Sequence, residues 1–263
     1  MTDDQVLLSG RHVLVTGAGT GIGAAIATAA ALAGARVSLA GRRPEPLIAM
    51  AASLTGAETH PIPGFDVTEP ARIAAGVAAA HQAFGPIDIL VNNAGEAPSA
   101  PFAKTDPGTW KRTLDVNLTG TFLVTREVLP DMLSKRAGRV INIASTAGLV
   151  GYAYVTAYVA AKHGVIGLTR SLALELAKSG ITVNAVCPGY TDTPLLERAV
   201  EAIVAKTGRS AAAVGASLAS SNPQGRLVLP QEVAQSVLWL ASAGAAAITG
   251  QAIVVAGGEV MVG

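Results

Sequence analysis

The chain has 263 residues, half of them hydrophobic and only 14% charged, with 29 glycines and one cysteine. This composition is too apolar for a disordered chain, and the length allows one large domain with a sizeable core. A formal net charge of +1 without a basic run gives no electrostatic basis for binding nucleic acid. The single cysteine, Cys187, excludes a disulfide within the chain and is typical of a reducing compartment.

Two stretches, 13–35 and 140–161, carry no charged residue and are long enough to cross a bilayer. The first contains five glycines, and the second contains "STAG" and three tyrosines, which is not the composition of a lipid-facing helix. The N-terminus, "MTDDQ", is acidic and lacks the positively charged start of a secretory signal. We therefore expect buried strand–turn–helix units in a cytoplasmic protein that does not contact a membrane.

Short apolar runs alternate with helical patterns along the chain. The run "HVLVT" at 12–16 precedes an alanine-rich helical stretch at 22–34 that ends in glycine. Further strands are expected at 36–40, 60–67, 87–92, 138–145, 180–189 and 251–258, and further helices at 44–54, 69–84, 107–134, 155–178 and 230–242. Apolar strands that are each followed by a helix are typical of a parallel sheet covered on both faces. The pattern predicts an α/β fold, a doubly wound Rossmann-type parallel sheet of about seven strands, in one domain over 1–263.

One segment, roughly 190–229, breaks this alternation. It mixes helical pieces such as "LLERAVEAIVAK" with "SSNPQG", and it is long for a connection in a compact domain. Long connections are often lids or binding loops, so we expect this segment to cover a substrate site. The alternative is an additional pair of helices without a role in the site.

The stretch "VTGAGTGIGAA" joins the first expected strand to the first helix, where a phosphate-binding turn belongs. Its spacing is G-x-x-x-G-x-G through Gly17, Gly21 and Gly23, because Ile22 occupies the last glycine position of the usual G-x-G-x-x-G. Glycines let the backbone approach a pyrophosphate, and the amides at the helix N-terminus favour its charge. The turn predicts a dinucleotide site, although a tight strand–helix turn without a ligand shares part of this pattern.

The stretch "YVAAK" places Tyr158 and Lys162 four residues apart, on one face of the expected helix. A free phenol has a pKa of about 10 and transfers protons poorly at neutral pH. An ammonium group within about 4–6 Å favours the phenolate and lowers that pKa towards the range of efficient acid–base catalysis. The pair predicts a tyrosine whose pKa is lowered by its lysine. The alternative is a pair of residues on a solvated face.

Ser145 ends the strand expected at 138–145, where its hydroxyl can hydrogen-bond a substrate oxygen. Its surroundings, "IASTAG", do not match G-x-S-x-G, which excludes a hydrolase nucleophile elbow. The histidines are scattered, and no cluster of His, Cys, Asp and Glu has metal-ligand spacing, so we expect no metal site. Cys187, beside Pro188, is more typical of a small buried hydrophobe than of a reactive thiol.

Five features occur in the order and approximate spacing of the short-chain dehydrogenase/reductase family: "TGAGTGIG" at 16–23, "NNAG" at 92–95, Ser145, "YVAAK" at 158–162 and "PGYTDT" at 188–193. The sequence resembles the compact single-domain branch of that family over essentially its whole length. The resemblance implies a catalytic set of Asn117, Ser145, Tyr158 and Lys162. Tyr158 would exchange a proton with the substrate and Ser145 would polarise its carbonyl. Lys162 would bind the nicotinamide ribose, and Asn117 would hold a water.

The resemblance also implies a nicotinamide dinucleotide cofactor. In such folds an acidic residue after the second strand binds the ribose 2′-hydroxyl of NAD, whereas an arginine accommodates the 2′-phosphate of NADP. Gly41 occupies the acidic position here, and Arg42 and Arg43 follow it. This favours NADP(H) over NAD(H), unless both arginines are solvated surface charges. The residues expected at the cofactor are Gly17, Thr20, Gly21, Ile22, Gly23, Arg42, Arg43, Asp66, Val67, Asn93, Ala94, Gly95, Tyr158, Lys162, Pro188, Gly189, Thr191 and Thr193.

The expected substrate pocket is lined mostly by small and apolar residues, with one carboxylate and several phenols. Its members are Glu96, Ala147, Gly148, Tyr152, Tyr154, Tyr190, Leu195 and Leu196. "PGYTDTPLLE" and the ending "AITGQAIVVAGG" resemble relatives that act on 3-oxoacyl or 3-hydroxyacyl compounds. The resemblance implies an oxidoreductase that interconverts a ketone and a secondary alcohol, with a 3-oxoacyl thioester of CoA or a carrier protein as the expected substrate.

Two other functions stay open on the sequence alone. One is an NAD(H)-dependent dehydrogenase of secondary alcohols or 3-hydroxyacyl compounds, and the other is a non-catalytic NADP(H) sensor. The apolar helices expected at 107–134 and 155–178 resemble the subunit interface of the family, which implies a homotetramer.

Overall fold

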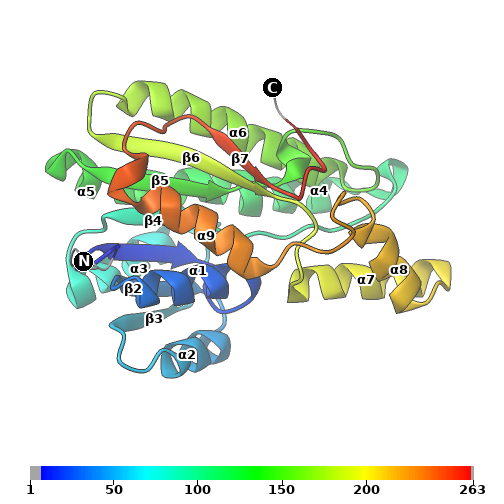
Figure 1. The fold of residues 1–263 in the computed structure, drawn as a ribbon, viewed down its shortest axis with the longest axis horizontal. Coiled ribbons are helices and arrows are strands. Elements are labelled where there is room, and N and C mark those ends of the chain that lie inside the picture. The colour runs from blue at the N-terminus through cyan, green and yellow to red at the C-terminus, as the bar shows by residue number, and fades with distance from the viewer. Residues whose placement is uncertain (1–6, 262–263) are drawn as a thin grey trace.

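In the computed structural model, which describes residues 7–261, seven parallel strands form one sheet in the order β3-β2-β1-β4-β5-β6-β7 (Figure 1). The strands are β1 His12–Thr16, β2 Arg36–Gly41, β3 Thr59–Pro63, β4 Ile89–Asn92, β5 Gly138–Ile143, β6 Ile181–Pro188 and β7 Ala252–Val255. Every residue of β1, β4 and β6 is buried, because a strand between two helical layers has no solvent side. The predicted Rossmann-type sheet is confirmed.

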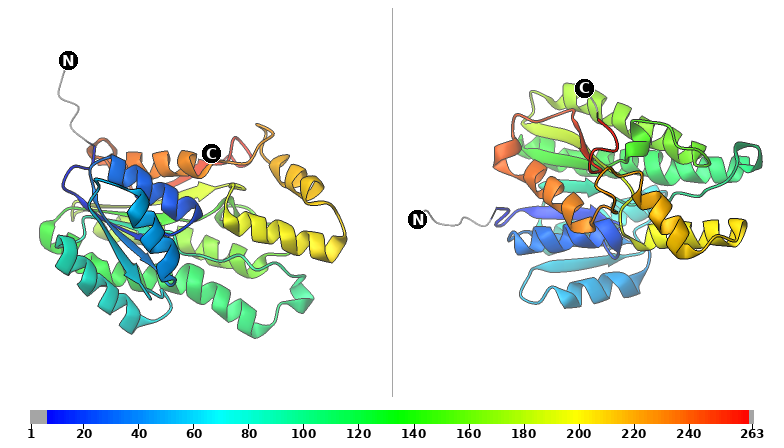
Figure 2. Two further views of the ribbon diagram at one scale, coloured as in Figure 1. Left: turned by 90° about the horizontal axis from the view of Figure 1, so that it is seen from below. Right: turned by 45° about the vertical axis from the view of Figure 1, so that its right-hand side comes forward.

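Helices cover both faces of the sheet (Figures 1 and 2). On one face lie α1 (Gly21–Leu32), α2 (Pro44–Ser53) and α9 (Pro230–Ala241); on the other lie α3 (Pro70–Phe84), α5 (Gly120–Lys135) and α6 (Thr156–Leu176). Alternate strand residues enter separate cores, since successive side chains point to opposite faces of a sheet. Val13 and Val15 pack with the first layer, and Leu14 packs with the second.

The helix expected at 107–134 is interrupted in the structure. It begins as α4 (Pro107–Leu114), passes through a π-helical segment (Asp115–Thr119), and continues as α5. Asn117 lies inside this segment and is buried. Single π-helical turns are often found at functional sites. The hydrophobic period of the sequence contained no signal for this change.

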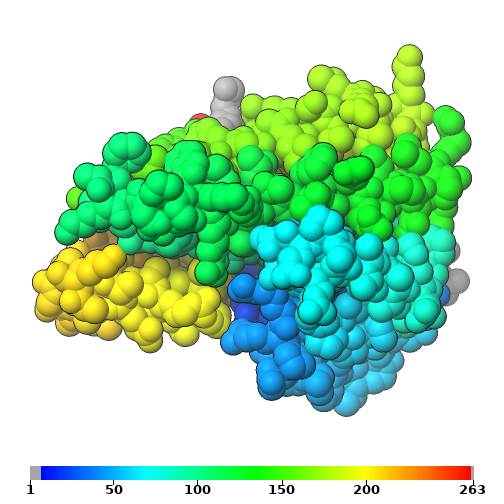
Figure 3. All heavy atoms as spheres, turned by 180° about the vertical axis from the view of Figure 1, so that it is seen from behind, coloured from blue at the N-terminus to red at the C-terminus, as the bar shows by residue number. Residues whose placement is uncertain are grey.

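The segment 190–229 forms two helices, α7 (Pro194–Thr207) and α8 (Ala211–Ala219), beyond the carboxyl edge of the sheet (Figure 1). A parallel bridge between Thr191 and Val228 holds the start and end of this segment together. Figure 3 shows α7 and α8 (yellow) beneath the chain around α4 (green), with a hollow between them and α2 (blue). The two helices lie beside this hollow, and the expectation that the segment covers a substrate stays a prediction.

Several boundaries differ from the expected ones. The strand expected at 60–67 ends at Pro63, so that Asp66 and Val67 lie in the loop that follows it. Short 3-10 segments occur at Phe102–Lys104, Thr146–Gly148 and Ala243–Ala245. No helix within residues 7–261 is long and apolar enough to cross a membrane.

Candidate active site

A cleft of about 850 Å³ opens where the loops after β1, β2, β4, β5 and β6 face α7. Ligands of doubly wound folds bind at this carboxyl edge, beside the point where the strand order reverses. All four predicted catalytic residues line the cleft: Asn117, Ser145, Tyr158 and Lys162. The cleft is also lined by every other residue predicted for the cofactor or substrate except Gly23 and Gly148.

Gly23 and Gly148 act through close packing and do not reach the cleft wall. A Cβ atom on Gly23 would lie 2.2 Å from the carbonyl oxygen of Gly17, so only glycine lets α1 approach the turn so closely. A Cβ atom on Gly148 would lie 2.8 Å from the carbonyl oxygen of Lys162. Neither glycine lines the cleft, because backbone atoms fill the space beside it, and a ligand contact at these two positions stays a prediction.

The glycine turn is built to receive an anion. Gly17 and Gly21 have φ of 67° and 56°, the left-handed region that favours glycine. Thr20, at the N-cap of α1, makes no capping hydrogen bond through its side chain, and the first turn of α1 contains no acidic residue. The first amides of α1 are therefore available to a phosphate group, which the helix dipole also favours. These features fit the pyrophosphate of a dinucleotide.

The "NNAG" turn is fastened to the glycine turn by side-chain hydrogen bonds. The Oγ1 atom of Thr16 accepts from the backbone amides of Asn93 (2.9 Å) and Ala94 (3.0 Å). The side-chain Nδ2 of Asn93 donates to the carbonyl oxygens of Thr16 (2.9 Å) and Gly17 (3.3 Å). Thr16 therefore positions two of the loops that form the cleft. Its role was missed, although it belongs to the quoted "TGAGTGIG", because its partners lie more than seventy residues away in sequence.

The end of the cleft formed by β2 and the loop after β3 carries positive charge. Arg42 and Arg43 line it, and neither forms an ion pair with a carboxylate of residues 7–261. Asp66 accepts hydrogen bonds on Oδ1 from the amide (2.9 Å) and hydroxyl (2.7 Å) of Thr68. Burial raises the pKa of Asp66, but the bonds from Thr68 and the nearby arginines outweigh it and leave that pKa below its usual value. Asp66 is therefore ionised at neutral pH.

Ser145 is oriented by the short 3-10 segment that follows it. Its Oγ accepts a hydrogen bond from the amide of Ala147 at 3.1 Å. Because that bond uses a lone pair of the oxygen, the hydroxyl proton is left to donate to a ligand. The residue thus has the geometry of a hydrogen-bond donor at the end of β5.

Tyr158 and Lys162 lie together on α6, but their pKa values are not those expected. Lys162 is 4% exposed, and its Nζ donates to the carbonyl of Ile143 at 2.8 Å. Burial lowers the pKa of Lys162 to about 8. Burial also raises the pKa of Tyr158, and the nearby Ser145 hydroxyl only partly opposes this. The prediction that Lys162 lowers the pKa of Tyr158 was wrong for this structure, because desolvation of both groups dominates.

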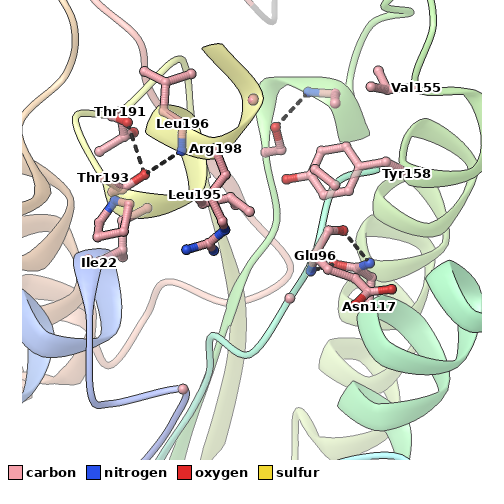
Figure 4. Close-up of a pocket in the computed structure, with 18 of the residues that line it drawn as sticks. Ile22, Glu96, Asn117, Val155, Tyr158, Thr191, Thr193, Leu195, Leu196 and Arg198 are labelled. Atoms are coloured by element: carbon pink, nitrogen blue, oxygen red, sulfur yellow. Dashed lines mark hydrogen bonds between the residues drawn. The ribbon is translucent and has the colours of Figure 1, made fainter. Parts of the chain in front are cut away.

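Asn117 connects the π-helical segment to the loop after β4. Its Nδ2 donates to the carbonyls of Glu96 (2.8 Å) and Thr113 (2.9 Å), and its Oδ1 accepts from the amide of Glu96 (3.3 Å). The carboxylate of Glu96 forms a two-pronged ion pair with Arg112, with both N–O distances 2.9 Å. The backbone of Glu96 is therefore held by Asn117 and its carboxylate by Arg112, which together fix the wall of the cleft beside Tyr158 (Figure 4).

Tyr152 and Tyr190 pack together in the expected substrate pocket, and Tyr152 is bonded to a carboxylate that is distant in sequence, Glu259. The Tyr152 hydroxyl donates to Glu259 at 2.7 Å and lies 2.9 Å from the hydroxyl of Thr146. Tyr190 packs edge-on against Tyr152, with ring centroids 6.1 Å apart. Burial, together with Glu259, raises the pKa of Tyr152, which therefore stays protonated. No sequence motif pointed to Glu259, because it follows β7 and contacts Tyr152 only through the fold.

Tyr154 lies at the rim of the cleft in a strained backbone conformation. Tyr154 is 63% exposed and has φ of 68°, a strained value for a non-glycine residue. Its carbonyl accepts from the amide of Ala100 at 2.8 Å, which ties the rim of the cleft to the loop after β4.

Cys187 is fully buried, and burial raises the pKa of its thiol to about 11, so it is the inert thiol that the sequence favoured.

Helix α7 begins directly against the glycine turn. Thr193 caps it by accepting from the amide of Leu196 at 3.3 Å, and a Cβ atom on Gly21 would lie 3.2 Å from the Thr193 methyl group. Figure 4 shows Arg198 pointing from α7 into the space that Tyr158 faces from α6. Sequence reasoning missed the three basic residues of this segment that line the cleft: Arg198, Lys206 and Arg209.

Comparisons with known proteins agree with this geometry. The family model for short chain dehydrogenases matches residues 11–203. A Streptomyces violaceoruber protein assigned as ketoacyl reductase 1 of the granaticin polyketide synthase is 46% identical, covering 93% of this chain and 91% of its own length. The D-beta-hydroxybutyrate dehydrogenase of Cupriavidus necator is 39% identical, with coverages of 93% and 95%.

The fold comparison adds a solved structure. A variant of the actinorhodin polyketide ketoreductase, crystallised with NADPH, superimposes with a TM-score of 0.91 at 41% identity and covers 95% of this chain and 97% of its own. The matches extend over the glycine turn, the Ser145–Tyr158–Lys162 set and the start of α7. The chain is therefore an oxidoreductase that acts on CH–OH and C=O groups with a nicotinamide dinucleotide, and it belongs to the short-chain dehydrogenase family.

Proposed function

We propose that this protein reduces 3-oxoacyl thioesters, or closely related β-keto compounds, with NADPH. The observation that carries the proposal is the convergence of Ser145, Tyr158 and Lys162 in one cleft. That cleft starts at Arg42 and Arg43, which form no ion pair with a carboxylate of residues 7–261, and continues beneath the apolar face of α7. The ketoacyl reductase named among its relatives and the ketoreductase crystallised with NADPH support the same reaction.

The preference for NADPH follows from the charge at the end of β2. A guanidinium group matches a phosphate in charge and geometry, whereas it gains little from a ribose hydroxyl. Gly41 offers no carboxylate to bind that hydroxyl. Arg42 and Arg43 would hold the 2′-phosphate, while the amides of α1 would hold the pyrophosphate and Asp66 with Val67 would face the adenine. Pro188, Gly189, Thr191 and Thr193 would surround the nicotinamide.

The reaction needs one hydride and one proton. A bound nicotinamide would supply the hydride, and the protein supplies the proton that the carbonyl oxygen receives. Ser145 donates a hydrogen bond to that oxygen and stabilises its developing charge. Tyr158 transfers its proton, which its raised pKa retains at neutral pH. Lys162 then contributes positive charge beside the phenolate, and Asn117 maintains the wall where a water can return the proton.

The remaining expectations concern assembly and organisation. Exposed apolar side chains on α5 and α6, among them Phe122, Leu133 and Leu174, favour a homotetramer built on these helices. We also retain a single cofactor-binding domain over 1–263 with α7 and α8 as its lid, and a cytoplasmic location. A mass measurement in solution that finds a stable monomer would exclude the tetramer.

The test is the rate of NADPH oxidation with acetoacetyl-CoA, beside NADH at equal concentration. Fast turnover with NADPH and little with NADH supports the whole proposal. Fast turnover with NADH alone would support the catalytic residues but would show that Arg42 and Arg43 are surface charges that do not bind a 2′-phosphate. It would favour the alternative of an NAD(H)-dependent hydroxyacyl dehydrogenase. No turnover of any β-keto thioester with either cofactor would exclude the proposed substrate.

A further inference from the structure

The cleft-facing side of α7 differs in charge from its outer side. Leu195, Ala199 and Ile203 line the cleft at spacings of four residues, which is one face of a helix. Arg198 and Lys206 line it with them, whereas the two acidic residues of the helix, Glu197 and Glu201, do not. The lid therefore presents an apolar stripe with cations towards the cleft and its carboxylates towards solvent.

The cations of the lid are not neutralised by acidic partners. Within residues 7–261, no carboxylate lies within ion-pair distance of Arg198, Lys206 or Arg209. Lys206 donates to the carbonyl of Ser99 at 2.9 Å, and Arg209 donates to the carbonyl of Ala213 at 3.0 Å. Both bonds orient the side chains but leave their positive charge uncompensated.

The carboxylates of the cleft cannot balance this charge either. Among residues 7–261, only Asp66 and Glu96 line the cleft as acids. Glu96 is already paired with Arg112, and Asp66 belongs to the loop after β3 with Thr68 and Arg42 around it. The positive charge at the far end of α7 therefore lacks a partner within the described chain.

Helix α7 is long enough for an extended ligand to lie along it between Tyr158 and the rim of the cleft at Lys206. Thr193 and Arg198 lie beside the glycine turn and Tyr158 (Figure 4), while the bond from Lys206 to Ser99 joins the lid to the opposite rim. A helix rises 1.5 Å per residue, so Lys206 lies about 12 Å beyond Arg198 along the axis. An extended ligand with its reacting end at Tyr158 would follow the apolar stripe and end at this rim.

We propose that Lys206 and Arg209 form a phosphate-binding subsite for the far end of an extended thioester arm. This proposal rests on the proposed reduction of 3-oxoacyl thioesters and specifies how such a substrate is held. The group bound is a phosphate separated from the thioester by an uncharged chain, as in pantetheine 4′-phosphate. Free CoA and a carrier protein both present this chemistry, and the test separates the shared phosphate from the nucleotide of CoA.

The experiment compares three acetoacetyl thioesters: N-acetylcysteamine without phosphate, pantetheine 4′-phosphate with one, and CoA with the nucleotide in addition. In K206Q/R209Q we expect KM for the two phosphorylated substrates to rise about tenfold. The values of kcat, KM for NADPH and KM for the N-acetylcysteamine thioester should not change. Raising the ionic strength should increase KM of the parent only for the phosphorylated pair, because the binding is between charges.

The control is E197Q/E201Q, which also changes the charge of the lid by two units, in the opposite direction, at residues of α7 that do not line the cleft. We expect its kinetics to match the parent, which excludes a general effect of lid charge. An equal rise of KM for all three thioesters in K206Q/R209Q would mean a loosened lid and would overturn the subsite. A rise confined to CoA would place the contact at the nucleotide and also overturn it.

A binding measurement separates this proposal from the proposed function. Calorimetric titration with pantetheine 4′-phosphate, which carries no acyl group, needs no turnover. Binding that weakens about tenfold in K206Q/R209Q supports the subsite even if no β-keto thioester is reduced. Equal binding by parent and variant overturns the subsite, even if the parent reduces acetoacetyl-CoA rapidly.

Discussion

The ammonium nitrogen of Lys162 lies 5.6 Å from the centre of the Tyr158 ring while it donates to the carbonyl of Ile143. The cation therefore lies over the ring and is held by the Ile143 carbonyl. Because Lys162 is buried and Tyr158 is half-buried, the charged form of each is disfavoured. At neutral pH the phenol keeps its proton, which is the form that a reductase needs before each turnover.

Replacing Tyr158 by Phe should remove the proton donor without changing the shape of the cleft. General acid catalysis contributes roughly 10²- to 10⁴-fold, so we expect kcat to fall by that factor. The dissociation constant of NADPH, measured by fluorescence titration, should change little, since most of the expected cofactor contacts lie elsewhere. Tyr154→Phe is the matched control and should keep the parent kcat. Full activity in Tyr158→Phe would assign the proton to another group.

The pKa of Lys162 makes the stability of the protein depend on pH. Its pKa is about 8 in the fold, against an ordinary value of 10.5. Between these values the unfolded chain binds more protons than the native one, so this group makes stability rise with pH from about 8 to 10.5. The difference corresponds to at most about 3 kcal/mol, since one pKa unit is about 1.4 kcal/mol.

The variant Lys162→Met lacks this titration. Urea unfolding of parent and variant at pH 7, 8.5 and 10, at one protein concentration and without cofactor, measures the difference. We expect the parent to gain stability relative to Lys162→Met as the pH rises. A difference that stays constant over this range would show that the lysine titrates normally.

Gly41 gives a direct test of the cofactor preference. A Cβ atom there would lie 3.5 Å from Leu47, which is an ordinary contact, so the backbone of Gly41 can carry a side chain without a clash at Cβ. Gly41→Asp places a carboxylate where it would repel a 2′-phosphate and accept from a ribose hydroxyl. Hydrogen bonds to charged groups contribute about 1.5–3 kcal/mol, so we expect the ratio of kcat/KM for NADPH over NADH to fall by roughly 10- to 100-fold. Gly41→Asn, of equal size but neutral, should change this ratio much less.

Gly23 should be essential although it does not line the cleft. Gly23→Ala would bring its methyl group within 2.2 Å of the Gly17 carbonyl and 2.5 Å of the Asn93 amide, which forces the turn open. We expect NADPH binding to weaken at least tenfold and the midpoint of thermal unfolding to fall. Gly215→Ala in α8 is the control, because its methyl group meets no atom within 4 Å. That change should leave binding intact and stabilise the helix by about 0.5–1 kcal/mol.

Local sequence patterns were sufficient for the architecture and for most of the cleft. The alternation of apolar strands with helices predicts a parallel sheet, and parallel strands bring their carboxyl ends to one edge. Motifs that follow different strands, such as the glycine turn and Ser145, therefore had to meet there. The position of Arg42 and Arg43 in the cleft was predictable for the same reason, since it depends only on where β2 ends.

Properties that depend on burial or on distant partners were decided by the tertiary structure. The pKa shifts of Tyr158 and Lys162 follow from the extent to which the fold buries each group, which residue spacing does not reveal. The π-helical turn at Asn117, the bond from Tyr152 to Glu259 and the cations that α7 turns into the cleft each arise where separate elements pack together. A sequence records the order of such elements but not the contacts between them, and these contacts determine the chemistry of the site.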